Sequence, residues 1–559
     1  MNTLFTKNVN AKNRIVFILV LSLFSIMEAQ EFPKILSDKQ TSTTHYLPDF
    51  SYAGYEYGEQ PISRSKGKII LATDFGVIPN DGLDDTKALK KAMEVANKTD
   101  GTAILQLPAG RIILSEILYV ERSHFVLRGT GTGVSGSEIY FPRPLMYVKD
   151  PEDLKELREY LIKFDKRQRE KENNIDLPFS QYAWSGGFIW TRVPGVRVKS
   201  YLKKYERPYN VLAKVHEGKR GDYTFTVSDV KGLKKGDVVV LQLFNKQGEK
   251  GIVIKDLYKG CDVKVGSHHW MFPDLPIVRQ QVEIVNVSKN KITIKTPLTI
   301  DVKPEYEAQL SEWKHLEQVG IEHIKLTFTP NVRIAHHVER GNNGIFLTRV
   351  FNSWVNDIVI ENADSGILTE EIANVTIQNI TLKGTNIAHY TVAMAGVHNI
   401  LAQNIRVYNK AEHPLSFNTF STKNVYHNCE VFRDPILDQH SGANHQNLFD
   451  KITVHVLPSE KRSYPLFAGG GAPYWKPSHG AYNTFWNIKV HFLSGLDSEA
   501  PFLLYGMKDG VHARLIGIHG NNPLNIKYEP ESYKEFINKP LHSVPSLYEY
   551  QLNKRLNKK

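Results

Sequence analysis

Cysteine is scarce in this chain: Cys261 and Cys429 are its two cysteines in 559 residues. Small exported domains that lack a large core are usually held by several disulfides, but at most one bridge can form here. The fold must therefore depend on a hydrophobic core, and a 41% share of hydrophobic residues is sufficient to build one. The length allows one long domain with an insertion, or two to three domains.

Beyond the N-terminus, the chain also lacks any apolar run close to the ~20 residues that a transmembrane helix needs. At the N-terminus, Lys7, Lys12 and Arg14 precede the apolar run "IVFILVLSLFSIMEA", which ends at the small residue Ala29. This order is typical of a secretory signal peptide. We therefore expect residues 1–29 to be removed and the mature protein to be secreted or periplasmic. No cysteine stands at the cleavage point after Ala29 to carry a lipid, so we expect no membrane anchor.

Acidic residues are the minority among charged residues, with 59 Asp and Glu against 70 Lys and Arg, for a formal net charge of +11. No nucleic-acid-binding motif accompanies this excess, so we expect no nucleic-acid partner. A basic surface on an exported protein attracts anionic glycans, although solubility alone would also account for the charge. The sequence thus favours a monomer that binds an anionic polysaccharide.

Residues 73–133 combine one helical pattern with several short strand patterns. Asp84 or Asp85 is placed to cap a helix whose apolar side chains recur at helical spacing: Ala88, Leu89, Ala92, Met93 and Ala96. The strands "AILQL", "RIIL", "ILYV" and "FVLRG" follow, separated by Pro, Gly and Ser. Brief strands at such spacing are typical of a tightly wound all-β coil.

The string "DFG...DG..DDT.A...A......G....LPAG" in this segment resembles the N-terminal cap of the pectate-lyase-like right-handed parallel β-helix superfamily. The resemblance implies an all-β fold, a right-handed parallel β-helix with an N-terminal capping helix. It implies no particular chemistry, because the superfamily includes lyases, glycoside hydrolases and phage tailspikes. We interpret Asp74, Asp81, Asp84 and Asp85 as turn and cap residues. The preceding "LPDFSYAGYEYGEQ" is similar to the lead-in of secreted Bacteroidota polysaccharide-degrading proteins of this type.

The resemblance and the patterns together divide the chain. After the signal peptide we expect a lead-in over 30–65, the cap and first coils over 66–145, an inserted helix and small β subdomain over 146–310, the main coils over 311–525, and a basic C-terminal tail over 526–559. The inserted helix is indicated by apolar residues on one face of the charged stretch 151–175. The strands "YTFTVSD", "DVVVLQLF", "QVEIVNV" and "KITIKTPL" indicate the β subdomain.

A repeat of about 25 residues organises the second half of the chain. Asn374, Asn399, Asn424 and Asn447 lie 25, 25 and 23 residues apart (399−374, 424−399 and 447−424). Each period predicts one turn of a solenoid. Asparagines at equivalent bends can hydrogen-bond from turn to turn, while neighbours such as Val375 and Ile377 fill the core.

Counting 13 to 16 residues past each anchor, beginning from Asp357, reaches ionisable side chains in every turn. Neighbouring parallel strands lie about 4.7–4.9 Å apart, so such groups would form a column. A charged solvent-facing surface is the alternative interpretation, but His, Tyr and carboxylates in register are more typical of an active site. The catalytic candidates are Glu371, His389, Tyr390, Glu412, His413, Asp438 and His440.

Cationic and aromatic residues near this column are candidates for substrate binding. The aromatic pair in "GGGAPYWKP" is expected to stack on sugar rings, and "GSHHWMF" in the insertion could overhang the same site. The candidates are Arg433, Lys461, Arg462, Tyr474, Trp475, His268 and Trp270. The sequence shows no second ligand at metal-binding distance from the paired histidines of the insertion, so it predicts no metal site and no required cofactor, with calcium left open.

Three functions fit these residues. A lyase acting on an ulvan- or pectin-like acidic or sulfated polysaccharide needs a cation for the substrate carboxylate and a base for the C5 proton, and the His, Tyr and Arg content favours this β-elimination. A glycoside hydrolase would use a carboxylate pair, such as Glu412 with Asp438 or Glu371 with Glu412. A non-catalytic glycan-binding β-helix would need only the aromatic residues.

Overall fold

The computed structural model describes residues 32–37, 46–62, 65–164, 177–197, 209–246, 251–259, 275–440, 442–469, 477, 480–493, 500–506, 510–530 and 532–558. The expected signal peptide lies outside these ranges, as do Cys261 and the candidates His268, Trp270, Tyr474 and Trp475. Within these ranges no helix is both long and apolar enough to cross a membrane.

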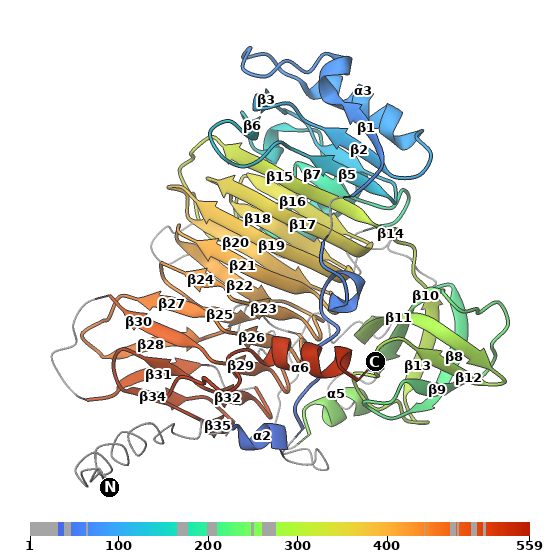
Figure 1. Cartoon of the computed structure of the whole chain (residues 1–559), viewed down its shortest axis with the longest axis vertical. Helices are drawn as coiled ribbons and strands as arrows, with labels where there is room; N and C mark the ends of the chain where they lie inside the picture. The colour runs from blue at the N-terminus through green and yellow to red at the C-terminus, as the bar shows by residue number, and fades with distance from the viewer. Residues whose placement is uncertain are drawn as a thin grey trace, which may run out of the picture.

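Parallel strands stack along the long axis of the molecule (Figure 1). The first sheet contains β1 (Lys68–Leu71), β2 (Ala103–Gln106), β3 (Gly110–Ile113), β5 (Phe125–Arg128), β6 (Ser137–Phe141), β14 (Leu316–Glu317), β15 (Val319–Phe328), β17 (Val350–Glu361), β19 (Ala373–Lys383), β21 (Leu401–Val407), β23 (Val425–His427), β24 (Glu430–Val431), β26 (Leu448–Asp450), β27 (Thr453–Val456), β29 (Thr484–Trp486), β30 (Lys489–Phe492), β32 (Arg514–Ile516), β33 (His519–Gly520) and β35 (Tyr533–Glu535). Successive coils contribute neighbouring strands, so the chain winds as a solenoid.

The second sheet is formed by the strands that alternate with these: β4 (Leu118–Val120), β7 (Ile189–Thr191), β16 (Asn343–Thr348), β18 (Ser365–Glu370), β20 (Ala388–Ala395), β22 (Ala411–Phe417) and β25 (Leu437–Gln439). A third, shorter sheet continues it with β28 (Ser463–Phe467), β31 (Phe502–Gly506) and β34 (Leu524–Lys527). Parallel strands joined by crossovers are right-handed almost without exception. The predicted right-handed parallel β-helix is confirmed.

The interior of the coils is apolar and the bends are held by asparagines. Val375 and Ile377 are fully buried, as the repeat predicts. Asn424 Nδ2 donates to Asn447 Oδ1 at 3.0 Å, and the backbone N–H of Asn447 donates to Asn483 Oδ1 at 2.7 Å. This ladder satisfies backbone groups at the turns and extends one coil beyond the anchors found in the sequence.

The N-terminal end of the stack is closed by a cap. It contains the short helix η2 (Ala72–Phe75) and α3 (Thr86–Asn97), which buries Leu89, Ala92 and Met93. Asp84 Oδ1 accepts from the backbone N–H of Thr86, the first residue of α3, at 2.9 Å, whereas Asp85 occupies the N-cap position without a side-chain hydrogen bond to the helix. Asp85 instead accepts from the backbone of Ile78 and Ile113 in the adjoining turns.

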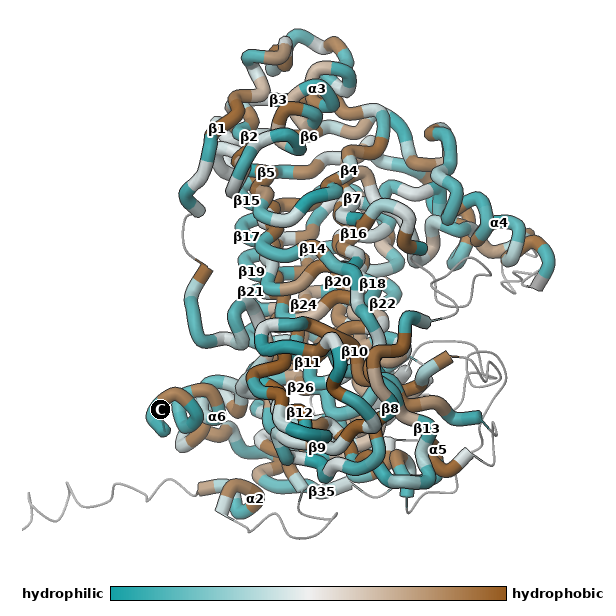
Figure 2. The backbone as a smooth tube through the Cα atoms, turned by 90° about the vertical axis from the view of Figure 1, so that its right-hand side faces the viewer, coloured by the Kyte–Doolittle hydropathy of each residue, from teal (hydrophilic) through white to brown (hydrophobic). Residues whose placement is uncertain are grey.

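Most of the segment between the cap and the main coils lies beside the stack. The helix α4 (Glu152–Phe164) projects sideways (Figure 2) and buries Leu154, Leu157 and Leu161. A closed antiparallel barrel follows, made of β8 (Val211–Gly218), β9 (Thr224–Val227), β10 (Val238–Phe244), β11 (Pro276–Ser288), β12 (Lys291–Ile294) and β13 (Glu307–Glu312), with α5 (Ile252–Leu257). Strand β7 differs from the expectation for 146–310, because it pairs with β4 and β16 inside the second sheet.

The two ends of the described chain pack together on the first sheet. The N-terminal end contains α2 (Lys34–Ser37) and η1 (Tyr55–Gly58), and the C-terminal end contains α6 (Leu547–Leu556). Away from both ends, the short helix η3 (Leu145–Tyr147) precedes α4. Asp450 of β26 accepts from the backbone N–H groups of Leu547 and Tyr548 and so holds the start of α6. The expected basic tail is therefore folded over much of its length, because Leu547 and Tyr548 bury apolar surface that the lysines of this segment obscure in the sequence.

Candidate active site

Three neighbouring strands of the second sheet bring most of the catalytic candidates together. His389 and Tyr390 lie on β20, His413 on β22 and Asp438 on β25, with His440 directly after β25. Tyr390 is paired in register with His413. All five are at least nine-tenths buried, with His413 and His440 the most exposed at 8% each. We call these five residues the column.

The rings of the column are in contact along the stack. The ring centroids of His389 and Tyr390 are 4.2 Å apart, and those of Tyr390 and His413 are 5.0 Å apart, both stacked. The His413 and His440 rings meet edge to face at 4.5 Å. Rotation of any one ring is therefore hindered by its neighbours, which fixes the direction of the ring nitrogens.

Asp438 is the charged centre of the column. Its Oδ2 lies 3.2 Å from Nδ1 of His413 and 3.1 Å from Nδ1 of His440, and it accepts a hydrogen bond from the Ser416 hydroxyl. Burial raises the pKa of Asp438, but His413 and His440 outweigh burial and hold it below its ordinary value. The carboxylate thus stays ionised and directs the opposite nitrogen, Nε2, of each imidazole away from itself.

The pKa shifts of two side chains in the column, His440 and Tyr390, favour one as a base and the other as an acid. Burial lowers the pKa of His440, against the opposing effect of Asp438, so its imidazole is neutral near pH 7. Burial, reinforced by Asp438, raises the pKa of Tyr390, so its phenol keeps its proton. A neutral imidazole accepts a proton and a phenol can donate one, which is the pairing that general acid–base chemistry requires.

The structure adds three residues that the repeat did not reveal. His336, His337 and Glu339 lie in the connection between β15 and β16 and reach the column from the side. The His336 and His389 ring centroids are 4.5 Å apart, and Glu339 Oε1 lies 3.3 Å from Nδ1 of His389. The string "HHVER" was visible in the sequence, but it precedes the first anchor used for counting.

Glu412 lies at the edge of this group rather than within it. Its carboxylate is 2.6 Å from Arg333, with about one-third of the Glu412 side chain and one-quarter of the Arg333 side chain exposed. This ion pair is the part of the site most open to solvent among the residues just described. A substrate carboxylate or sulfate could compete with Glu412 for the Arg333 guanidinium.

Glu371 was misplaced by the counting, and the structure corrects it. Tyr390 pairs with Ser365, so Glu370 lies five positions farther along β18 (370−365) and Glu371 is in the turn beyond. The Glu371 carboxylate is buried between two arginines, 2.8 Å from Arg279 of the barrel and 2.6 Å from Arg349. Through these two ion pairs, Glu371 links the barrel to the coils.

We expect Glu371→Gln to destabilise the protein by about 3–5 kcal/mol, because the buried side chains of Arg279 and Arg349 lose the carboxylate that they share. Turnover at a temperature where the variant is folded should be nearly unchanged. Denaturant unfolding measures the first quantity. Glu361→Gln, which removes a partly exposed partner of Lys325 and Lys383, is the matched control and should cost about 1 kcal/mol or less. Equal stabilities of the two variants would contradict this role.

The binding candidates in the described part of the chain are more dispersed. Arg433 and Lys461 are exposed, and Arg462 is half-buried and donates to the carbonyl of Ala500. None of the contacts described for these three residues links them to the column. Their role in binding stays a prediction, as does that of the aromatic pair and the insertion residues.

No protein-family model matches the chain, and no curated protein matches it. Among solved structures, it is similar to the tailspike protein of Pseudomonas phage LKA1 (11% identity, 83% of this chain and 79% of that chain, TM-score 0.46). It is also similar to the A-module of a mannuronan C-5 epimerase from Azotobacter vinelandii (11%, 85% and 97%, TM-score 0.35) and to an exopolygalacturonase from Thermotoga maritima (9%, 84% and 93%, TM-score 0.32). Similarities of this strength do not define a function.

Proposed function

We propose that this protein is an exported, monomeric enzyme that cleaves an acidic or sulfated polysaccharide by β-elimination. The observation that carries the proposal is the buried Asp438 carboxylate, which hydrogen-bonds Nδ1 of His440 at 3.1 Å and lies 3.2 Å from Nδ1 of His413. A carboxylate that fixes an imidazole in this way prepares the far nitrogen to act as a base. A surface that only binds glycans has no use for a buried carboxylate between two imidazoles.

In the proposed reaction, Nε2 of His440 removes the proton at C5 of a uronic acid residue. The electron pair of that C–H bond becomes the double bond between C4 and C5. The bond from C4 to the glycosidic oxygen breaks, and its electron pair leaves with the oxygen. The Tyr390 phenol protonates that oxygen, since its raised pKa keeps the proton available until the oxygen becomes basic.

Positive charge beside the substrate carboxylate would make the C5 proton more acidic. Arg333 is the described cation at the edge of the column, and its pairing with Glu412 keeps it oriented until an anion arrives. The net charge of +11 would favour the approach of a polyanion. The choice of an ulvan- or pectin-like substrate rests on this charge.

A glycoside hydrolase is the second candidate, because the column and its edge contain Asp438 and Glu412. Two contacts count against it. Glu371 is held by two arginines away from the column, and Asp438 is directed at two histidines instead of a water or sugar. A hydrolase also needs one carboxyl group that keeps its proton; the pKa of Asp438 is lowered, whereas burial raises the pKa of Glu339.

A panel of anionic algal and plant polysaccharides tests the proposal. Each is incubated with the mature protein and read for new reducing ends and for the ultraviolet absorbance of an unsaturated uronide. We expect both signals to rise together on at least one substrate. Reducing ends without absorbance would indicate a hydrolase, and binding without either signal would indicate a glycan-binding protein.

A further inference from the structure

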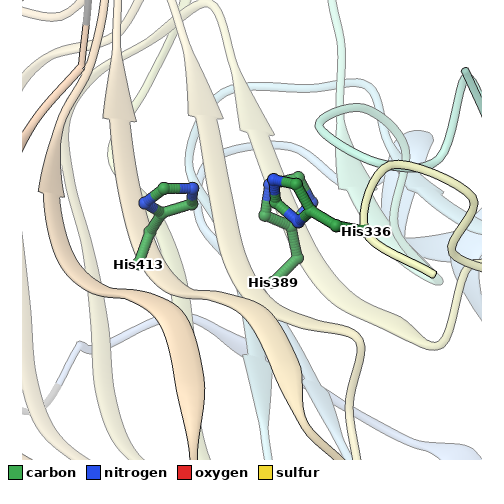
Figure 3. A group of neighbouring side chains, drawn as sticks. All are labelled: His336, His389 and His413. Carbon is green, nitrogen blue, oxygen red and sulfur yellow. The ribbon is translucent and has the colours of Figure 1, made fainter. Parts of the chain in front are cut away.

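Three histidines from separate segments converge on one side of the column. His389 on β20 and His413 on β22 lie side by side and are directed the same way, and His336 reaches His389 from its connection (Figure 3). One ring nitrogen from each lies within 4.8 Å of the others. Imidazole nitrogen is the commonest protein ligand for zinc and related ions.

A carboxylate lies behind each of the two strand histidines. Asp438 Oδ2 is 3.2 Å from Nδ1 of His413, and Glu339 Oε1 is 3.3 Å from Nδ1 of His389. Histidines that bind metals almost always place their other ring nitrogen against a carboxylate, a carbonyl or water, which fixes the tautomer and makes the ligand more basic. Both histidines have a carboxylate on the Nδ1 side, at ion-pair distance rather than in a hydrogen bond, and Nε2 of each faces away from that carboxylate as the candidate ligand atom.

These two Nε2 atoms are buried and have no hydrogen-bond partner among the residues that the structure describes. His389 is 1% exposed and His413 is 8% exposed. A buried ring nitrogen without a partner costs about 1–3 kcal/mol, so two beside one another need an explanation. A shared cation would satisfy both at once.

We propose that His336, His389 and His413 bind one divalent first-row transition-metal ion of the Zn²⁺ class. Three nitrogen donors favour such an ion over calcium, which takes six to eight oxygen ligands. With Zn–N distances of about 2.0–2.1 Å, a tetrahedral site places its nitrogens about 3.3–3.4 Å apart. The three rings therefore draw together around the ion, and His336 moves most readily because it lies in a connection rather than a strand.

Three protein ligands leave a fourth position open, which is the pattern of catalytic rather than structural zinc sites. The His413 ring lies 4.5 Å from that of His440, so an ion held by His413 would lie next to the group assigned as the base. If the proposed function holds, a substrate carboxylate or sulfate would occupy it and gain the positive charge that β-elimination requires. Metal binding itself does not depend on that function.

Metal binding by the mature protein, with no polysaccharide present, tests the site. After removal of metals with a chelator, Zn²⁺ is titrated by calorimetry, and Co²⁺ is followed by the visible absorbance that four-coordinate nitrogen ligation produces. We expect about one ion per chain by either measurement. Calcium in excess should not displace Co²⁺, because the donors are nitrogens.

Variants decide which residues bind. His336→Ala and His389→Ala should each abolish the Co²⁺ absorbance, and Glu339→Gln should weaken Zn²⁺ binding about 10–100-fold through His389. His455→Ala is the matched control, since its ring pairs with Glu430 on the first sheet, and it should bind as the wild type does. His336 is in a connection, so its variant gives a result even if His389→Ala fails to fold.

The proposal is overturned if the wild type binds no stoichiometric Zn²⁺ or Co²⁺, or if His336→Ala binds Co²⁺ as tightly as the wild type. Both results are independent of catalysis. A protein that binds zinc at this site but cleaves no polysaccharide would refute the proposed function and leave the metal site standing.

Discussion

His440→Ala is expected to lower turnover by about two to four orders of magnitude, the usual contribution of a residue that transfers a proton in the transition state. His440 is positioned by Asp438 at 3.1 Å and reaches the edge of the column, with 11% of its side chain exposed. Its removal deletes the base and leaves the coil packing intact. The melting temperature should change little, and the loss should appear in kcat rather than in KM.

His445, five residues farther on, is the natural control because it shares the same stretch of sequence and has a different place. It is fully buried at a bend of the first sheet, where its backbone N–H donates to the Ser421 carbonyl at 3.0 Å and its Nδ1 lies 3.2 Å from Gln446 Nε2. His445→Ala should lower stability by about 1–3 kcal/mol. Its turnover should match the wild type. A fully active His440→Ala would remove His440 from the mechanism and make Glu412 and His413 the leading candidates.

Asp438→Asn is the second substitution with a large expected effect, and we expect a loss of turnover of at least about 10²–10⁴-fold. Both Nδ1 atoms face the same oxygen, Oδ2, so an amide NH₂ at that position would oppose the Nδ1–H of both rings. An amide oxygen at that position would face both rings without the negative charge that orients them. Because both rings depend on the same carboxylate, this substitution should cost at least as much as His440→Ala.

Asp434→Asn provides the comparison for that loss. Asp434 lies four residues earlier, and its exposed carboxylate pairs with Lys410 at 3.2 Å. Removing an exposed ion pair should change stability by about 1 kcal/mol or less and leave turnover unaltered. Steady-state kinetics and thermal unfolding of the two variants side by side measure both effects. Equal activity in both variants would show that Asp438 is only a core residue.

The fold could be predicted from the sequence because two local signals specify it. The cap string reflects turn geometry that Asp81, Asp84 and Asp85 stabilise within a few residues of one another. The period of about 25 residues reflects one coil, and Asn424 and Asn447 record it because their side chains bond to each other. The pairing of β7 within the second sheet could not be predicted, because its three residues lie in a long insertion that shows no sequence repeat.

The site could be predicted only in part, for a reason that the strand register makes plain. Counting from the anchors found His389, Tyr390, His413, Asp438 and His440, since β20, β22 and β25 begin 14, 12 and 13 residues after Asn374, Asn399 and Asn424 (388−374, 411−399 and 437−424). It failed for Glu371, because the count began from Asp357, whereas the register of β17 with β19 makes Asn352 the residue that corresponds to Asn374. It also missed His336, which joins the column from a connection 53 residues before His389 (389−336). A metal site assembled across such a gap has no spacing to recognise.

The most direct test of the account is whether oxygen from water enters the cleavage products. Cleavage of a susceptible polysaccharide is run in water enriched in oxygen-18, and the products are weighed by mass spectrometry. β-Elimination breaks the bond between C4 and oxygen without adding water, so the account predicts unsaturated products that carry no label. Saturated products with oxygen-18 at the new reducing end would mean hydrolysis, and would contradict the assignment of His440 as the base that removes the C5 proton.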